Sequence, residues 1–330
     1  MVKGFWKKLP RPFFALAPMA DVTDSPFRHM IAKYGKPDVM WTEFVSCDGM
    51  CSVGREEIGK RLVYEKNERP IVAQIFGANP ENVYKCTQYI CGLGFDGIDI
   101  NMGCPEKSIQ RQGAGASLIQ TPLLAQEVIH AAREGVRAAK SKIPVSVKTR
   151  IGYHRDTLEE WLPFLIEAQP AAITIHGRTK KEMSKVSTHW DRIGTASEMI
   201  HASGDISHRP LIIGNGDIRT LQEGREKAAL YNLDGIMVGR GVFGKPWFFN
   251  TEYEHIKMSL EERFAIMIEH AHLFRKYFPA ESAFNIMKKH FKAYVSDFKG
   301  AKQLRVALMQ AHDVADIETT IQSFLGNKKY

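Results

Sequence analysis

The fold of this chain can be predicted by starting from the stretch Phe95-Asp-Gly-Ile-Asp-Ile-Asn-Met-Gly-Cys-Pro105. Ile98 and Ile100 alternate with polar residues, and because strand side chains alternate between faces, the pattern predicts a short strand. The proline ends that strand, since it cannot extend a sheet ladder. Cys104 therefore lies in a turn at the carboxyl end of a strand, beside the polar Asn101. A lone cysteine is more often an inert core residue, but this position makes Cys104 a candidate reactive thiol.

The residues after this turn predict a loop and then a helix. Gly113 and Gly115 suggest a loop whose backbone passes close to a ligand. Thr121 and Pro122 form an N-cap followed by a proline in the first helical turn. Apolar residues at helical spacing then predict a helix over residues 121–140.

Composition indicates a soluble globular protein. The chain has 330 residues, of which 44% are hydrophobic and 25% charged, and this length suits one large domain plus a small one. A net charge of +8 is compatible with a polyanionic partner but modest for the length. Five cysteines without C-x-x-C spacing favour reduced thiols in the cytoplasm over a disulfide framework or a zinc site. No apolar run is long enough to span a bilayer, so we expect no membrane association.

Eight short apolar runs recur along the first three-quarters of the chain, each followed by a polar or glycine-bearing turn. Helical patterns fill several of the gaps between them. Strands that alternate with helices over about 250 residues are typical of a TIM (β/α)8 barrel. An open doubly wound sheet is the alternative, but no strand is followed by a G-x-G-x-x-G helix opening. The predicted strands are Phe13–Ala17, Asp38–Glu43, Ile71–Phe76, Gly97–Asn101, Val145–Thr149, Ala172–His176, Leu211–Asn215 and Gly235–Gly239.

Polar and glycine residues gather at the carboxyl ends of these strands, where function collects in a TIM barrel. Glycine-rich turns after the seventh and eighth strands predict a bound phosphate group, because backbone N–H groups can approach an anion closely there. Lys148 interrupts an apolar strand, and a buried lysine is costly unless it is paired or functional, so we expect a cofactor anion beside it. The residues at these strand ends are Ala17, Pro18, Met19, Thr42, Glu43, Gln74, Gly77, Asn101, Cys104, Lys148, Arg150, His176, Arg178, Thr179, Asn215, Gly216, Asp217, Gly239, Arg240 and Gly241.

The strand pattern stops near residue 250, and the remaining residues predict a small helical domain. Ser259 and Glu262 form a capping box that opens an amphipathic helix. We therefore expect a catalytic barrel over residues 1–250 and a helical domain over 251–330. A second predicted helix carries Lys288, Lys292 and Lys299 beside an apolar stripe, which gives the helical domain a basic side. The predicted apolar stripes are Phe264, Met267, Ala271, Phe274, Phe278 and then Phe284, Met287, Phe291, Val295, Phe298, followed by helices at Gln303–His312 and Asp316–Leu325.

Taken together, these motifs resemble the tRNA-dihydrouridine synthases. The similarity covers residues 13–250, and the helical tail resembles the RNA-binding domain of that family. No single motif establishes the resemblance, but the whole set in this order is specific to that family. The motifs are Ala17-Pro-Met-Ala-Asp-Val-Thr-Asp-Ser-Pro-Phe-Arg28, Asn101-Met-Gly-Cys-Pro105, Lys148, His176-Gly-Arg-Thr179, Asn215-Gly-Asp217 and Gly239-Arg-Gly241.

The resemblance implies an FMN enzyme that reduces a uridine of tRNA to 5,6-dihydrouridine, with NADPH as the electron source. Hydride comes from the reduced flavin and a proton from Cys104. A thiol of ordinary pKa is protonated at neutral pH and can donate a proton without activation. The remaining roles are a cofactor site and a uracil site. The flavin ring would be contacted by Ala17–Met19, Gln74 and Lys148. Its ribityl chain and phosphate would be held by His176, Asn215, Gly216, Asp217, Gly239 and Arg240. The uracil would be positioned by Asn101 and Arg150.

One segment, Lys180–His189, departs from the family pattern, which usually has a tyrosine and a glycine before its Asp-Trp. Two other functions remain open on the sequence alone. One is an FMN barrel oxidoreductase that acts on a small pyrimidine, of the dihydroorotate or dihydropyrimidine dehydrogenase type. The other is a flavin-free RNA-binding barrel, which leaves Lys148, Cys104 and His176 without a chemical role. A monomer is the default expectation.

Overall fold

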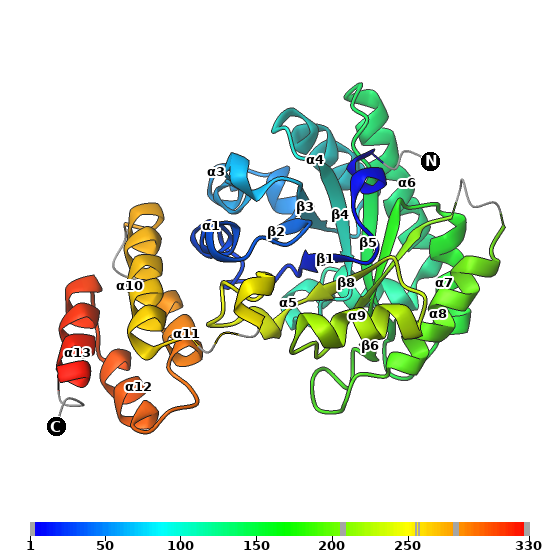
Figure 1. The fold of residues 1–330 in the computed structure, drawn as a ribbon. Helices are drawn as coiled ribbons and strands as arrows, with labels where there is room; N and C mark the ends of the chain where they lie inside the picture. Colours follow the sequence, from blue (N-terminus) through cyan, green and yellow to red (C-terminus); the bar gives the residue numbers. More distant parts are fainter. Residues whose placement is uncertain (1–3, 205–208, 255, 257, 280–283, 327–330) are drawn as a thin grey trace.

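The computed structural model describes residues 4–204, 209–254, 256, 258–279 and 284–326, and within them eight parallel strands form a barrel (Figure 1). Consecutive strands pair with one another, and β1 also pairs with β8. A bridge between Ala15 and Val39 joins β1 to β2 and closes the ring. The predicted TIM barrel is therefore confirmed. The strands are β1 (Phe13–Leu16), β2 (Met40–Ser46), β3 (Ile71–Phe76), β4 (Gly97–Met102), β5 (Val145–Gly152), β6 (Ala172–Thr179), β7 (Leu211–Asn215) and β8 (Gly235–Val238).

The predicted strand boundaries differ from the structure mainly at β2, β5 and β6. β2 begins two residues later than predicted and ends three residues later, and the carboxylate of Asp38 before it accepts a hydrogen bond from the backbone N–H of Phe14 at 2.7 Å. β5 and β6 run three residues further, and their pairing shifts register between Arg150 and Gly152. The extra length carries charged strand residues into the mouth of the barrel.

Helices surround the barrel (Figure 1). The helix predicted over residues 121–140 is α6, although the hydroxyl of Thr121 makes no capping hydrogen bond. None of the described helices is long and apolar enough to cross a membrane. The α-helices before the tail are α1 (Ser25–Tyr34), α2 (Cys47–Met50), α3 (Arg55–Gly59), α4 (Pro80–Gly92), α5 (Lys107–Gln110), α6 (Pro122–Ala138), α7 (Leu158–Glu167), α8 (Trp190–Ala202) and α9 (Leu221–Leu230). The 3-10 helices are η1 (Gly4–Lys8), η2 (Lys60–Leu62), η3 (Lys66–Glu68), η4 (Gly115–Gln120), η5 (Arg240–Val242) and η6 (Thr251–Glu254).

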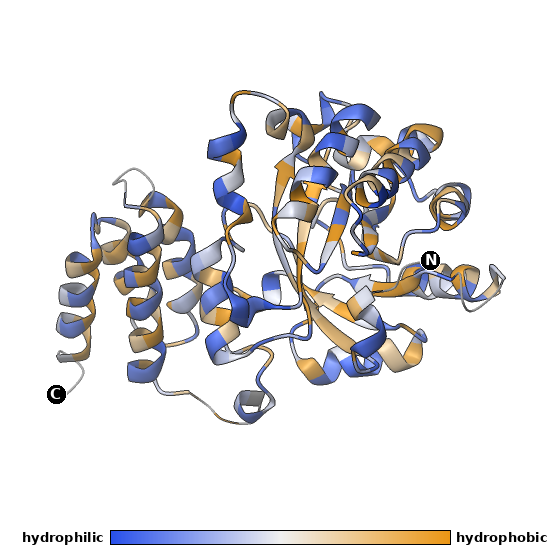
Figure 2. Ribbon diagram, turned by 90° about the horizontal axis from the view of Figure 1, so that it is seen from above, coloured by the Kyte–Doolittle hydropathy of each residue, from blue (hydrophilic) through white to orange (hydrophobic). Residues whose placement is uncertain are grey.

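The amino-terminal end of the barrel is filled by aromatic side chains. Trp6 in η1 is buried, and its ring lies 5.5 Å from that of Phe13 and 5.9 Å from that of Trp41. Hydrophobic residues run along the strands, while the surrounding helices carry both hydrophobic and hydrophilic residues (Figure 2). With this end closed by apolar packing, the polar groups of the barrel collect at the opposite, carboxyl end.

The helical tail consists of α10 (Leu260–Tyr277), α11 (Phe284–Tyr294), α12 (Ala301–Met309) and α13 (Val314–Gly326). Both hydrogen bonds of the predicted Ser259–Glu262 capping box are present. The predicted apolar stripes are buried or half-buried in one cluster. Phe298 lies beyond α11, not on it, because the helix ends at Tyr294 and Asp297 takes a φ of 65°. Its ring packs instead against Phe264.

The tail packs directly on α1 of the barrel, beside it in Figure 1. The ring of Phe27 lies 5.2 Å from His270 and 4.7 Å from His290, both of which are buried. The apolar cluster of the tail also includes Met30 and Trp247, which precede the tail in sequence. The two parts of the chain therefore share a packed interface.

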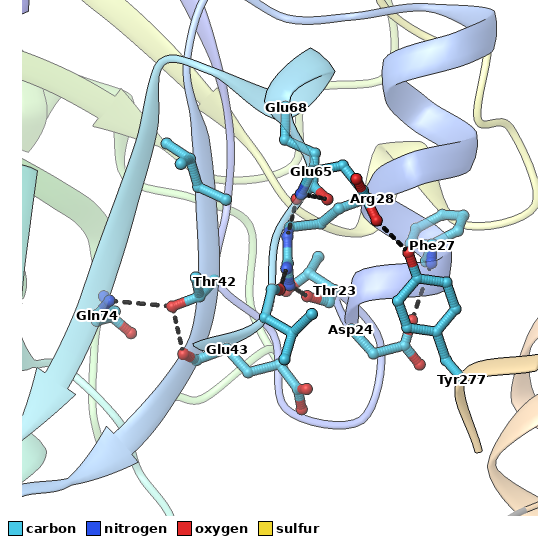
Figure 3. A network of polar contacts seen from close by, with 12 residues as sticks. Thr23, Asp24, Phe27, Arg28, Thr42, Glu43, Glu65, Glu68, Gln74 and Tyr277 are labelled. Atoms are coloured by element: carbon cyan, nitrogen blue, oxygen red, sulfur yellow. Dashed lines mark hydrogen bonds and ion pairs between the residues drawn. The ribbon is translucent and has the colours of Figure 1, made fainter. Parts of the chain in front are cut away.

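A buried ion pair supports this junction from the barrel side (Figure 3). Nε of Arg28 in α1 lies 2.6 Å from Glu68 of η3, and both side chains are fully buried. Arg28 also donates to the carbonyl of Thr23 at 2.7 Å. The hydroxyl of Tyr277 in α10 donates to the carboxylate of Glu65 at 2.8 Å, which links the tail to the same region.

We predict that Glu68→Gln destabilises the protein by about 3–5 kcal/mol, because it leaves the Arg28 cation buried without its counter-charge. Urea denaturation of wild type and variant measures the difference. The matched control is Glu81→Gln, which removes an exposed partner of Lys85 and should leave the urea midpoint unchanged. A Glu68→Gln midpoint equal to that of the control would show that the pair contributes nothing.

Candidate active site

One cavity of about 320 Å³ opens at the carboxyl ends of the strands, and it is lined by all fourteen residues to which the family resemblance gives a role. These are Ala17, Pro18, Met19, Gln74, Asn101, Cys104, Lys148, Arg150, His176, Asn215, Gly216, Asp217, Gly239 and Arg240. Five further residues complete its wall, namely Phe44, Gly103, Pro105, Met183 and Ser184. The structure therefore brings these fourteen residues to one place.

Strand register explains why these side chains meet. Asn101 on β4 pairs with Lys148 on β5, and Arg150 two residues later pairs with His176 on β6. His176 in turn pairs with Asn215 on β7. Because residues two apart share a face, Lys148 and Arg150 both face the cavity.

The turn that carries Cys104 is held by Asn101 and Arg150. The Asn101 side-chain oxygen accepts hydrogen bonds from the backbone N–H groups of Gly103 at 3.1 Å and Cys104 at 2.9 Å. Nε of Arg150 donates to the carbonyl of Gly103 at 2.7 Å. Two residues expected to position a substrate are therefore used, at least in part, to position the thiol.

Of the two glycines after Cys104, Gly115 packs tightly against the thiol turn. The backbone N–H of Ala116 donates to the carbonyl of Cys104 at 3.1 Å, which folds the loop back onto the turn. Gly115 has a φ of 61°, and a side chain there would lie 3.0 Å from that same carbonyl oxygen. Neither Gly113 nor Gly115 lines the cavity, so that interpretation of the sequence was wrong.

The Cys104 thiol is half-buried, and its pKa is raised above the ordinary value. Burial is the main cause, and it outweighs the opposing effects of the Glu106 backbone N–H and the Arg150 and Lys148 cations. The thiol is therefore protonated at neutral pH. This direction agrees with the expectation of a thiol that is not activated as a nucleophile.

Asp99, to which the sequence assigned no role, orients Gln74 at the base of the cavity. Nε2 of Gln74 donates to the Asp99 carboxylate at 2.6 Å, and Nδ2 of Asn101 donates to Oε1 of Gln74 at 3.0 Å. Ser146 donates to the other Asp99 oxygen at 2.6 Å. Burial raises the pKa of Asp99 to about 6, against the effect of these hydrogen bonds. Gln74 is thus fixed by protein partners on both polar atoms.

Lys148 is the cation without a partner in this cavity. Among the described residues, no hydrogen-bond acceptor or carboxylate pairs with its ammonium group. Burial lowers its pKa to about 8, and the neighbouring Arg150 lowers it further in the same direction. With a pKa of about 8 the ammonium is still mainly protonated at neutral pH, and a cation in a cavity wall is suited to an anionic ligand.

His176 is neutral in this site. Burial, followed by the charges of Arg150, Lys148 and Arg178, lowers its pKa well below the ordinary value. Nη1 of Arg178 lies 3.2 Å from Nε2 of His176, and because an arginine only donates, Nε2 must accept. The ring proton then resides on Nδ1, so His176 can donate one hydrogen bond to a ligand.

Asp217 links two arginines at the predicted phosphate turns. Its carboxylate is paired with Arg178 and Arg240 and accepts a hydrogen bond from Thr188 at 3.1 Å. Burial alone would raise the Asp217 pKa, but the hydrogen bond and charge of Arg178 and the charge of Arg240 lower it. Gly216 has a φ of 144°, and a side chain there would lie 2.5 Å from Thr188. Asp217 therefore fixes both arginines at these turns.

Sequence reasoning quoted Arg178 in a motif but gave it no role, although it is 2% exposed and central to this network. The divergent Lys180–His189 segment also reaches the site, since Met183 and Ser184 line the cavity. The carbonyl of Val186 accepts a hydrogen bond from Nε of Arg178 at 2.8 Å, which ties the segment to the strand end. In the sequence, the only indication that Arg178, Met183 and Ser184 belong to the site was their position just after a predicted strand.

Comparisons with known proteins agree with the resemblance noted in the sequence. The family model described as dihydrouridine synthase matches residues 15–329. A probable tRNA-dihydrouridine synthase of Staphylococcus epidermidis is 40% identical over 328 residues, covering 98% of this chain and 97% of the relative. Probable tRNA-dihydrouridine synthase 2 of Bacillus subtilis is 39% identical over 334 residues, covering 100% of this chain and 98% of the relative.

Solved structures share the barrel at much lower identity. A 2-naphthoyl-CoA reductase is similar with a TM-score of 0.55 and 9% identity, covering 73% of this chain and 50% of that chain. A 6-hydroxypseudooxynicotine amine oxidase of Pseudomonas geniculata N1 has a TM-score of 0.52 and 12% identity, covering 71% of this chain and 46% of that chain. At such identity these two structures support the fold alone. The family model and the relatives span nearly the whole sequence, and the chain therefore belongs to the dihydrouridine synthase family.

Proposed function

We propose that this chain is an FMN-dependent tRNA-dihydrouridine synthase that reduces a uridine of tRNA to 5,6-dihydrouridine with electrons from NADPH. The names of its relatives and its family support the substrate and the reaction. The observation that carries the chemistry is that a protonated thiol, Cys104, and a cation without a partner, Lys148, face one cavity. A reduction of a polarised double bond needs both a proton donor and a site for negative charge.

The residues of the cavity fit a flavin mononucleotide. Ala17, Pro18 and Met19 offer a largely apolar wall for a ring, and Lys148 offers its cation to the side of the ring that becomes negative on reduction. At the other end, glycine turns and arginine match a phosphate group. In this proposal Gln74 contacts the ring edge, and the ribityl chain and phosphate are held by His176, Asn215, Gly216, Asp217, Gly239 and Arg240.

The bound flavin would supply the hydride for one carbon of the uracil double bond, after NADPH has provided the two electrons. Cys104 then delivers its proton to the neighbouring carbon and regains one from solvent. Lys148 stabilises negative charge in the cavity through a fixed cation, without rearrangement of water. No step requires a thiolate, which agrees with the raised pKa of Cys104.

Asn101 and Arg150 retain hydrogen-bonding capacity for a uracil in addition to holding the thiol turn. Asn101 has a second amide hydrogen beyond the one that it donates to Gln74. Nη2 of Arg150 has no hydrogen-bond partner among the described residues. We propose that these donors face the uracil carbonyls, so that the same two side chains align the thiol and the base.

We propose that residues 1–250 form the catalytic domain and residues 251–330 a tRNA-binding domain, in a cytoplasmic monomer. A uracil stacked within folded RNA cannot enter the cavity, so it must be turned out. Lysines of the tail and the barrel rim would bind phosphates, which predicts salt-sensitive affinity. Lys289 of α11 lies 3.1 Å from Asp21, two residues beyond Met19 of the cavity wall, which ties α11 to this loop of the barrel.

Cys104→Ala tests the role of the thiol. We predict that the variant retains FMN and is reduced by NADPH at the wild-type rate. Its re-oxidation by unmodified tRNA should be slower by about 10²–10⁴-fold, because a positioned proton donor contributes that much. Cys91→Ala, on α4 and outside the cavity, is the matched control. Loss of FMN in Cys104→Ala alone would assign the thiol a structural role instead.

The pH dependence distinguishes a proton donor from a nucleophile. A donor is active when protonated, so its activity is lost as pH rises through its pKa, and the raised pKa of Cys104 moves that loss upward. We predict that re-oxidation by tRNA stays constant from pH 6 to about 8.5 and falls only at higher pH. Stopped-flow absorbance measures it. A rate that rises tenfold per pH unit over this range would indicate a reactive thiolate.

Lys148→Met tests the cation. We predict at least tenfold weaker FMN binding and a more negative flavin reduction potential, since the negative charge gained on reduction loses its partner. In wild type, FMN binding should weaken above pH 8, where the free enzyme loses the Lys148 proton at a pKa of about 8. Lys142→Met serves as the control, because the side chain of Lys142 is exposed at the far end of the barrel. Unchanged affinity and potential in Lys148→Met would remove Lys148 from the flavin site.

A further inference from the structure

Two hydrogen bonds link Tyr153 through Gln110 to Pro105, the residue after the thiol. The side-chain nitrogen of Gln110, the last residue of α5, donates to the carbonyl of Pro105. Its side-chain oxygen accepts a hydrogen bond from the hydroxyl of Tyr153 at 2.5 Å. Tyr153 follows β5 directly, so this contact joins the loop after β5 to the loop after β4.

The divergent segment after β6 holds Tyr153 in place. The backbone N–H groups of Lys180 and Lys181 donate to the carbonyls of Gly152 and Tyr153, each at 2.9 Å, and continue the ladder beyond the strands. The ammonium of Lys180 lies 4.7 Å from the centre of the Tyr153 ring, within reach of a cation–π interaction. The segment that departs from the family pattern thus fixes both the backbone and the ring of Tyr153.

The Cys104 turn needs this support on its far side. Asn101 and Arg150 hold the residues up to the thiol, and Ala116 binds the Cys104 carbonyl. The carbonyl of Pro105 is held by Gln110. That bond fixes the orientation of the Pro105 carbonyl, the first polar group of the chain beyond the thiol residue. Displacement of a reacting group by about 1 Å can cost roughly 10²-fold in rate.

We propose that Tyr153 and Gln110 are positioning residues that hold the Cys104 thiol for proton transfer. Neither residue lines the cavity, so neither touches a ligand there, and both act through Pro105. The proposal rests on the proposed function, because it takes Cys104 as the proton donor. It also assigns a role to the Lys180–His189 segment, which holds Tyr153 in place from the adjacent loop.

Tyr153→Phe tests the proposal, since it keeps the ring beneath Lys180 and removes only the hydroxyl. We expect about tenfold slower re-oxidation of the NADPH-reduced enzyme at saturating unmodified tRNA. The KM for tRNA, the FMN content and the rate of reduction by NADPH should stay within twofold of wild type. Gln110→Ala should show the same pattern, and the double variant should be no slower than either single variant, because the two residues act in series.

Tyr64→Phe is the matched control. Its hydroxyl donates to the carbonyls of Leu93 and Gly94 near the other end of the barrel, so its loss affects stability but not the thiol turn. Unchanged re-oxidation in Tyr153→Phe would overturn the positioning proposal. Equal slowing of reduction and re-oxidation would also overturn it, because a general structural defect produces that pattern.

A second readout does not depend on the proposed reaction. The rate at which iodoacetamide alkylates Cys104, followed by peptide mass mapping, should change at least threefold in Tyr153→Phe and not in Tyr64→Phe. An unchanged alkylation rate overturns the proposal. If wild-type enzyme is not re-oxidised by tRNA, the proposed function fails, and alkylation still decides whether Tyr153 holds the turn.

Discussion

The register between β4, β5 and β6 is the constraint on which this site depends. It places Asn101 beside Lys148 and Arg150 beside His176, so that one row of polar side chains faces the barrel mouth. Because side chains alternate along a strand, a slip of one residue would turn every member of that row away from the cavity. Apolar neighbours on the opposite face, among them Ile100, Val147 and Ile175, are buried in the core, and their burial opposes the slip. Packing of the core therefore determines the chemistry of the mouth.

Burial without matched counter-charges then sets the character of that mouth. Lys148, Arg150 and His176 lie together, and desolvation lowers the pKa of each. The nearby carboxylates are engaged elsewhere, Asp99 with Gln74 and Ser146, and Asp217 with two arginines. The cavity therefore has an excess of positive charge and a protonated thiol. Such an environment favours an anionic ligand and a proton donor, and it disfavours a thiolate nucleophile because burial raises the thiol pKa above its ordinary value.

The sequence was sufficient to predict the barrel and its eight strands, because these depend on local pattern, whereas the roles of the cavity residues came from the resemblance to a family. Alternation of Ile98 and Ile100 with polar residues identifies a strand, and strand ends in a barrel meet by topology. It could not predict contacts between residues distant in sequence. The buried Arg28–Glu68 pair, the use of Asn101 to cap its own turn and the bond from Tyr153 to Gln110 all depend on tertiary geometry. The interpretation of Gly115 failed for the same reason, since only the fold shows that it packs against Cys104.

The most direct test of the account is an anaerobic absorbance spectrum of the purified wild-type protein, recorded before NADPH, after NADPH and after unmodified tRNA. The account predicts a yellow protein that bleaches with NADPH and regains its colour only when the RNA is added, with dihydrouridine formed in equal amount. Recovery of the colour with a free pyrimidine and not with RNA would contradict the assignment of tRNA as substrate. A colourless protein that FMN cannot reconstitute would contradict the flavin site itself.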